Sequence, residues 1–168
     1  TGINVFPVWT SYTGRGVRVA IFDQGVDSTN PDLSGSVLTS LGRNASNLAL
    51  GGSPILSGDN HGTAVAGVIS SASNGYENVG VAFNANIIPI YSSLLLSSNF
   101  PAEIANAFTY AKDFDVLNNS WGTVNLFESG TNYAFIDDFS KPQWSIAAAA
   151  LKALADNGRG GLGTIVVQ

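Results

Sequence analysis

The sequence predicts an α/β domain built on a mostly parallel sheet. Four short runs rich in β-branched and other apolar residues have the length of strands, and longer helical patterns lie between them. Strands that alternate with helices form parallel sheets with right-handed crossovers, because each helix returns the chain to the edge where the next strand starts. At 168 residues, the chain is long enough to form one domain with a substantial core.

The first half of the chain contains one predicted strand and a long loop. Residues 1–16 are rich in turn formers, and the run 17–22 predicts a strand that stops at Asp23. Open α/β sheets form their sites at the C-terminal ends of such strands, although a carboxylate that only caps a turn is the simpler interpretation of Asp23 alone. Residues 28–60 are punctuated by glycine and proline and predict a loop with at most a hairpin.

A helix is predicted to begin at His61, the only histidine of the chain. Small residues recur in its apolar run and allow another backbone to approach closely, which is typical of a buried helix. Asp59 or Asn60 can cap its first turn. Because the positive end of the helix dipole disfavours an imidazolium, a histidine that accepts a proton here needs a nearby carboxylate. We expect Asp23 to supply that carboxylate.

The second half of the chain predicts strands and helices in alternation, with one irregular stretch. A proline near the first helical position and an acidic residue in the first turn favour a helix start at residue 99. An Asn-Gly pair is a good C-cap and predicts that the last helix ends at residue 157. The predicted elements are a strand at 87–91, a helix at 99–112, a strand at 115–120, an irregular segment at 123–142, a helix at 143–157 and a strand at 163–167.

Charge and composition exclude several classes of protein. Only 11% of the residues are charged and the net charge is −5, so the chain lacks the clustered Lys and Arg that nucleic acid binding requires. No apolar run approaches the roughly 20 residues of a membrane span. The absence of cysteine excludes a disulfide framework and a thiolate metal site, and fits a secreted, extracellular protein. The chain starts at Thr1 without a visible signal peptide, so we expect a processed or trimmed product.

Residues 158–163 match the dinucleotide-binding string G-x-G-x-x-G, but in the wrong context. That fingerprint must follow a strand and open a helix, so that the helix N-terminus faces the pyrophosphate. Here a predicted helix precedes the glycines and a predicted strand follows them. We therefore interpret the segment as a tight helix-to-strand turn and reject a nucleotide-binding function.

The order of three chemical groups narrows the function. Asp23 ends one strand, His61 opens a helix later in the chain, and Ser120-Trp121-Gly122 ends another strand. Asp before His on an α/β scaffold is the order of the subtilisin type of catalytic triad, whereas chymotrypsin-like enzymes place His first and α/β-hydrolases place Ser first.

The chain resembles the N-terminal half of a subtilisin-like (subtilase) serine protease catalytic domain, from about Asn4 to its last residue. Four motifs in the family's order and spacing carry the resemblance, and the glycine-rich tail with Ser-Trp-Gly is most similar to the kexin or proprotein-convertase branch. The resemblance implies a three-layer sandwich with a mostly parallel central sheet, of which residues 1–168 form only the N-terminal portion. The matching segments are 19–27 with 30–33, 61–67, 80–82 and 119–122.

The resemblance implies a role for each group of the triad order. Asp23 would hold His61 through the proton on Nδ1, and His61 would act as the general base and then as the acid for the leaving amine. Ser120-Trp121-Gly122 would form a wall of the S1 pocket and pair with a polypeptide substrate that adds as a β-strand. The implied activity of the parent protein is that of a serine endopeptidase.

A structural calcium site is also implied by the resemblance. A hard cation needs several oxygen ligands from a loop that can wrap around it. Asp32 would supply a carboxylate, Asn74 a side-chain oxygen, and Ala72, Tyr76 and Asn78 backbone carbonyls. The alternative is that residues 73–76 form a plain turn.

The chain departs from the family pattern at several positions. Gln24 follows the catalytic-type Asp where Ser, Thr or Asp is usual, and residues 123–125 replace the acidic residues that kexin-type enzymes place after Ser-Trp-Gly. Strict dibasic specificity is therefore in doubt. Glu103 could contribute an acid to the substrate site, but a carboxylate that stabilises a helix N-terminus is an equally good interpretation.

The nucleophilic serine and the oxyanion asparagine of the family are not in the sequence, which has no serine in a Gly-Thr-Ser-x-x-x-Pro context. Loss of a triad serine costs on the order of a million-fold in turnover. We therefore expect the chain to be inactive alone and to need the C-terminal part of the same domain as a partner. The main alternative function is a subtilase-like pseudoenzyme or non-catalytic peptide-binding module.

Overall fold

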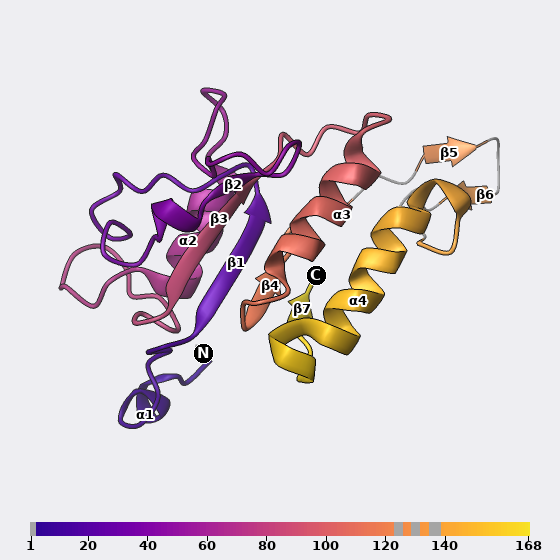
Figure 1. Cartoon of the computed structure of the whole chain (residues 1–168). Coiled ribbons are helices and arrows are strands. Elements are labelled where there is room, and N and C mark those ends of the chain that lie inside the picture. Colours follow the sequence, from indigo (N-terminus) through magenta and orange to yellow (C-terminus); the bar gives the residue numbers. More distant parts are fainter. Residues whose placement is uncertain (1–2, 123–125, 129–131, 135–138) are drawn as a thin grey trace.

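The computed structural model describes residues 3–122, 126–128, 132–134 and 139–168 (Figure 1). Its centre is a five-stranded sheet with the order β2-β3-β1-β4-β7, in which all neighbouring strands are parallel. A separate antiparallel pair, β5 and β6, lies away from this sheet. The strands are β1 Arg18–Asp23, β2 Arg43–Asn44, β3 Asn86–Tyr91, β4 Val116–Asn118, β5 Leu126–Glu128, β6 Asn132–Ala134 and β7 Ile165–Val167.

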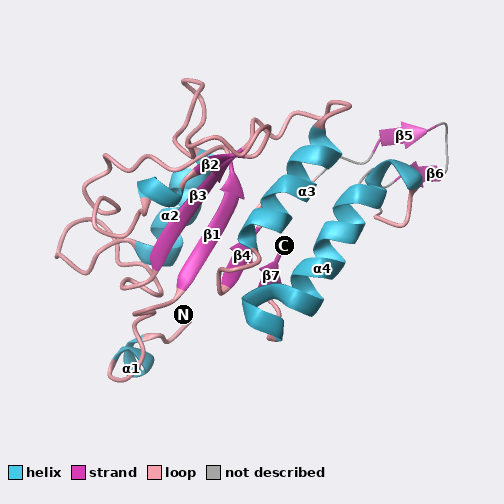
Figure 2. Cartoon of the chain, in the orientation of Figure 1, coloured by secondary structure: helices cyan, strands magenta, loops and turns pink. Residues whose placement is uncertain are grey.

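Helices connect the strands of the main sheet, as Figure 2 shows. One helix precedes β3, a second precedes β4 and a third precedes β7, which is the arrangement expected for parallel strands. Among the described residues, no helix has both the length and the apolar character that crossing a membrane requires. The helices are α1 Phe6–Trp9, α2 His61–Ser70, α3 Phe100–Ala111 and α4 Ser145–Gly161, with short 3-10 turns η1 Thr39–Leu41 and η2 Pro142–Trp144.

The fold has three layers, with α3 and α4 on one face of the sheet and α2 on the other, and a hydrophobic core fills the space on each face. Side chains alternate along β1, so that Ala20 and Phe22 pack with α3 and α4, while Val19 and Ile21 pack with α2. Both faces of β1 are therefore covered, which explains its continuous apolar run. The predicted three-layer α/β sandwich with a mostly parallel sheet is confirmed.

The end of α4 confirms the predicted glycine turn. Backbone angles leave the helical range at Gly158, Arg159 and Gly160, immediately after the predicted end of the helix. A Cβ on Gly158 would lie 2.6 Å from Oγ1 of Thr164, so a larger residue does not fit where the helix meets the strand. The glycine-rich segment thus joins the C-terminal end of α4 to β7, with the polarity opposite to that of a nucleotide-binding turn.

Other parts of the prediction need correction. The predicted loop 28–60 contains β2, which joins the main sheet beside β3, together with a single antiparallel bridge between Arg43 and Leu50. The stretch 123–142, predicted to be irregular, contains β5 and β6, although parts of it lie outside the described residues. These elements have only two or three residues each, which is too short to leave a periodic pattern in the sequence.

Candidate active site

The candidate site lies at the edge of the sheet where the central strands end. β1 ends at Asp23, and β3 ends at Tyr91, which is the register partner of Asp23. The chain leaves β4 through Ser120-Trp121-Gly122. His61 is the first residue of α2, which packs on β1. Parallel strands bring their carboxyl ends to one edge, so groups far apart in the sequence meet there.

Asp23 and His61 form a hydrogen bond. Nδ1 of His61 lies 2.9 Å from Oδ2 and 3.0 Å from Oδ1 of Asp23. The Asp23 side chain is fully buried, whereas the His61 side chain is 50% exposed. Because a carboxylate only accepts hydrogen bonds, Nδ1 carries the shared proton, and Nε2 of the neutral ring is left as a proton acceptor.

The Asp23 carboxylate has a second donor. The backbone N–H of Gln24 donates to Oδ1 at 2.7 Å. This contact uses the main chain, so it does not depend on the side chain at position 24. The departure of Gln24 from the family pattern therefore leaves the support of Asp23 intact.

Gly62 allows α2 to approach β1 closely enough for this hydrogen bond. A Cβ on Gly62 would lie 2.3 Å from the carbonyl oxygen of Gly25 and 3.0 Å from Cβ of Asp23. The first distance is shorter than real Cβ contacts allow and the second is tight, so a larger residue would force α2 or its neighbours to shift. The sequence indicated a close approach of this helix, and the structure shows that Asp23 is one of the groups approached.

Asn60 occupies the N-cap position of α2, but the predicted side-chain cap is missing. Neither Asp59 nor Asn60 makes a side-chain capping hydrogen bond to this helix. Instead, Oδ2 of Asp59 accepts hydrogen bonds from the backbone N–H groups of Ile55 and Leu56, at 3.2 and 2.8 Å. Its third donor is the hydroxyl of Tyr91, at 3.1 Å. The carboxylate is thus turned back into the preceding loop and toward β3.

The segment after β4 is anchored through Trp121. Its indole Nε1 donates to the carbonyl oxygen of Phe22 at 3.0 Å, and its ring packs edge-on against Phe22 and Phe100. Ser120 is exposed, and its hydroxyl accepts a hydrogen bond from Asn118. Gly122 is exposed as well. The segment therefore lies at the same edge as Asp23, held there by the tryptophan.

A small cleft beside Trp121 has an apolar lining. Its volume is about 310 Å³, and Trp121 and Gln168 form part of its wall. The side-chain amide of Gln168 donates to the carbonyl oxygen of Trp121 at 2.7 Å. Phe139 and Leu151 are the other described residues that line it.

Glu103 has a partner at this edge of the sheet. Its Oε2 accepts a hydrogen bond of 2.6 Å from the hydroxyl of Ser92, the residue that follows β3. Glu103 also lies in the first turn of α3, so the contact ties that helix to the end of the strand. Residues 123–125, where the sequence departs from the acidic kexin pattern, lie outside the described residues.

Some of the predicted calcium ligands contact one another, but not in an arrangement that points their oxygens at one position. Nδ2 of Asn74 donates to Oδ1 of Asp32 at 2.8 Å, and the backbone N–H of Ala72 donates to the carbonyl oxygen of Asp32 at 3.0 Å. Oδ1 of Asn74 accepts from the N–H of Tyr76. The amide thus turns a donor, not an oxygen, toward the carboxylate. Tyr76 and Asn78 lie in the same exposed loop.

These residues fit a cation after one local change. Asp32 is only 5% exposed. Its carboxylate accepts a hydrogen bond from the Asn74 side-chain amide, and a cation could take the place of that N–H group. Rotation of the Asn74 amide would present an oxygen there instead. Across the described residues, no three His, Cys, Asp or Glu side chains form a metal-binding group. A site here would depend on backbone carbonyls.

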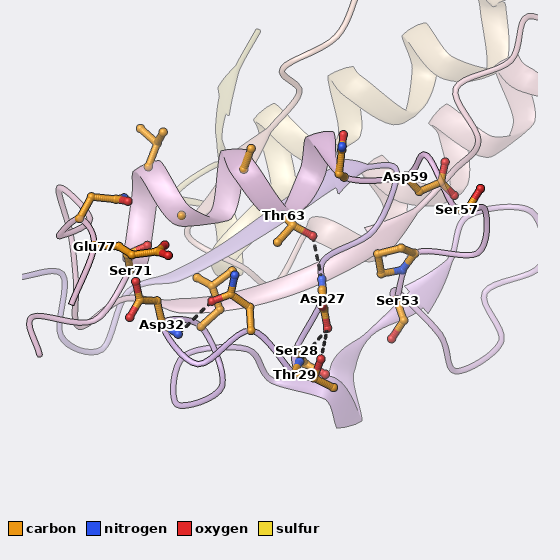
Figure 3. A pocket seen from close by; sticks show the side chains of 18 of the residues that line it. Asp27, Ser28, Thr29, Asp32, Ser53, Ser57, Asp59, Thr63, Ser71 and Glu77 are labelled. Carbon is orange, nitrogen blue, oxygen red and sulfur yellow. Dashed lines mark hydrogen bonds between the residues drawn. The ribbon is translucent and has the colours of Figure 1, made fainter.

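A larger hollow of about 940 Å³ lies beside α2, between the loops that precede and follow it (Figure 3). Its lining includes Asp27, Asp32, Asp59 and Glu77, and no Lys or Arg is among the described residues that line it. Thr29 donates two hydrogen bonds to Asp27, from its hydroxyl and its N–H, and these lower the pKa of the Asp27 carboxyl. The predicted calcium loop borders one end of this acidic hollow.

Comparisons with known proteins identify the family. Residues 14–168 match the family described as the subtilase family. The chain belongs to the subtilase family. Fervidolysin of Fervidobacterium pennivorans is 33% identical over 123 residues, and neuroendocrine convertase 2 of Rattus norvegicus is 31% identical over 176 residues. The aligned parts cover 68% and 98% of this chain, but only 18% and 25% of those relatives.

Solved protease structures share the fold. A serine protease of Aeromonas sobria in complex with a chaperone superposes with a TM-score of 0.66 at 21% identity, over 84% of this chain and 23% of that one. Fervidolysin superposes with a TM-score of 0.60 at 25% identity, over 88% of this chain and 21% of that one. The resemblance to the N-terminal part of a subtilase domain is therefore confirmed, and convertases are among the relatives.

Sequence reasoning missed the buried pair formed by Asp59 and Tyr91 and the contact between Ser92 and Glu103. Both pairs join the end of β3 to another part of the subtilase fold. The only signal in the sequence was a polar group directly at, or one residue after, the end of the strand 87–91. That signal could have marked the strand end as part of the site, but it could not name the partners.

Proposed function

We propose that the complete protein is a serine endopeptidase of the subtilisin type, with Asp23 and His61 as two members of its catalytic triad. The observation that carries the proposal is the hydrogen bond of 2.9 Å between a fully buried carboxylate and the Nδ1 of a half-exposed imidazole. Family membership supports the same reaction class. The position of both groups, at the carboxyl edge of a parallel sheet, is also where α/β folds place their active sites.

Each residue has a defined part in the proposed reaction. Nε2 of His61 takes the proton of the serine hydroxyl as that oxygen attacks the peptide carbonyl, and later gives it to the leaving amine. Asp23 keeps the ring in the tautomer with the proton on Nδ1 and stabilises the imidazolium that forms. Its burial and the N–H of Gln24 hold the carboxylate in one orientation.

The nucleophile belongs to the C-terminal part of the same domain in this proposal. The chain has no serine in the Gly-Thr-Ser context of the family, and the parts that align with it make up only 18% of fervidolysin and 25% of neuroendocrine convertase 2. The chain alone would then be inactive, because removing the triad serine costs on the order of a million-fold. Association with that C-terminal part would complete the site.

The substrate of the proposed enzyme is a polypeptide that binds in an extended conformation. Ser120-Trp121-Gly122 would offer its backbone to the substrate, with the cleft beside Trp121 receiving a side chain. The convertases among the relatives support a peptide substrate. Glu103 accepts one hydrogen bond from Ser92 and keeps further acceptor capacity, so its contribution to binding a basic substrate side chain stays a prediction.

A structural calcium ion is a second part of the proposal. Asp32 and the amide oxygen of Asn74 would bind it together with the carbonyls of Ala72, Tyr76 and Asn78. The support is the contact between Asp32 and Asn74 and the acidic lining nearby. A secreted, extracellular location completes the proposal, since the chain has no cysteine that an oxidising environment would affect.

The test uses the complete protein and this chain side by side. The complete protein should cleave an unstructured polypeptide and react with a fluorophosphonate, while this chain alone should do neither. Asp23→Asn and His61→Ala should each lower kcat of the complete protein by about 10⁴-fold or more. A complete protein that binds peptides without cleaving them would instead be the pseudoenzyme, and labelling of a serine in this chain would contradict its inactivity.

A further inference from the structure

A buried hydrogen bond links the end of β3 to the residues just before His61. The hydroxyl of Tyr91 donates to Oδ2 of Asp59 at 3.1 Å, and both residues are only 6% exposed. A buried carboxylate requires such partners, because leaving it without donors costs several kcal/mol. The pair is therefore a fixed feature of the fold and not a surface contact that exchanges with water.

Asp59 also fixes the path of the loop that enters α2. Its Oδ2 accepts from the N–H groups of Ile55 and Leu56, so the loop turns around one carboxylate oxygen. No side-chain capping hydrogen bond fixes the start of the helix, although the Thr63 hydroxyl in its first turn accepts from the N–H of Asp27 at 2.9 Å. The loop turn that Asp59 fixes thus contributes to the position of His61, two residues later.

Tyr91 connects this loop back to the other half of the site. It is the register partner of Asp23 on the neighbouring strand. A closed ring of contacts results: Asp23 pairs with Tyr91 in the sheet, Tyr91 binds Asp59, the chain leads from Asp59 to His61, and His61 binds Asp23. The links are the backbone pairing of β1 with β3, two side-chain hydrogen bonds, and the two peptide bonds from Asp59 to His61.

We propose that Tyr91 and Asp59 are positioning residues that hold the imidazole of His61 in hydrogen-bond contact with Asp23. The contact itself is present in the structure, and its importance for catalysis rests on the proposed function. Burial of Tyr91 and its bond to Asp59 also raise the pKa of the phenol, so the hydroxyl keeps its proton and remains a donor at neutral pH. A hydroxyl that ionised there would lose the proton on which the link depends.

The single histidine makes the test direct, because its imidazole signals cannot be confused with others. In a sample where this chain is ¹⁵N-labelled and the C-terminal part of the domain is added unlabelled, Nδ1–H of His61 should be protected from solvent exchange and the Nδ1–H tautomer should dominate. Tyr91→Phe removes only the hydroxyl and should speed this exchange by about tenfold. Tyr110→Phe is the matched control, since it removes a tyrosine hydroxyl that donates to the carbonyl of Leu41 at 2.7 Å, and it should leave the exchange unchanged.

Asp59 provides a second test of the same link. Asp59→Asn keeps an oxygen acceptor and should retain most of the protection, whereas Asp59→Ala should lose it. In the complete protein, Tyr91→Phe should lower kcat by about tenfold with little change in KM, as expected for a misplaced base. Equal exchange rates in Tyr91→Phe and Tyr110→Phe would overturn this inference alone. Failure of Asp23→Asn to change the His61 signals would overturn the proposed Asp-His pair as well.

Discussion

Gly62 lies against Asp23 so closely that an added Cβ would be 3.0 Å from the Cβ of the aspartate. The residue that follows the histidine is therefore packed on the carboxylate to which the histidine binds. Gly62→Ala should push α2 outward, weaken the contact between His61 and Asp23, and lower the free energy of unfolding by about 1–3 kcal/mol through overpacking. Chemical denaturation of the chain and the His61 NMR signals would measure both effects.

Gly67→Ala is the control for that substitution. Gly67 lies in the same helix, and its added Cβ would meet only Oγ of Ser71, at 3.3 Å. Alanine is the better helix former by about 1 kcal/mol, so this variant should be neutral or more stable, with His61 undisturbed. If the two glycine variants had equal stability and equal His61 signals, close packing at Gly62 would not determine the contact between His61 and Asp23.

Trp121→Phe should loosen the segment that the proposed substrate contacts. The variant keeps an aromatic ring against Phe22 but loses the hydrogen bond from Nε1 to the Phe22 carbonyl, which should cost about 1 kcal/mol of stability. In the complete protein, KM for a peptide substrate should rise. Trp9→Phe also removes an indole bond to a carbonyl, that of Val81, and is a matched control far from the site. An equal rise of KM in both variants would argue against a local role.

Calcium should stabilise the chain through Asp32. At about 100 times its dissociation constant, an ion that binds only the folded state adds about 3 kcal/mol, which a chelator would remove. Asp32→Asn should lower the melting temperature and abolish its response to chelator. Asp27→Asn changes another carboxylate of the same hollow and should keep the response. A wild-type melting temperature that is the same with calcium and with chelator would refute the site.

The sequence predicts those features of the fold that depend on local pattern. The β-branched run at 17–22 and the helix-start signals of the segment 99–112 mark β1 and α3 to within a residue or two. Asp23 and His61 could be expected to meet, since strand ends and helix starts share one edge of a parallel sheet. The family motifs pointed to the same pair.

The remaining features depend on long-range geometry. The contact between Tyr91 and Asp59 needs the register of β3 against β1 and the path of a loop, and neither leaves a periodic signal. The expected cap at Asp59 was wrong for this reason: a local rule assigns the carboxylate to its own helix, but a tyrosine and two loop amides bind it instead. Likewise, the sequence does not determine which way the Asn74 amide turns.

Tyr91 should contribute to the pH dependence of stability. Burial raises the pKa of its phenol, and the hydrogen bond to Asp59 raises it further. Because the pKa is higher in the folded than in the unfolded state, folding favours the neutral phenol. The contribution is complete below the unfolded value, about 10, and is lost as the pH rises through the folded value. Tyr91→Phe should therefore be less stable than the wild type at neutral pH, by about 1 kcal/mol.

The difference between the two proteins should then shrink above about pH 10, because only the wild type loses the neutral phenol. Urea denaturation from pH 7 upward would measure both curves. Trp121→Phe removes a hydrogen bond from a group that does not titrate, so its curve should run parallel to that of the wild type. If the Tyr91→Phe curve were also parallel, the phenol would titrate alike in the folded and unfolded states, and the link between β3 and the start of α2 would not depend on its proton.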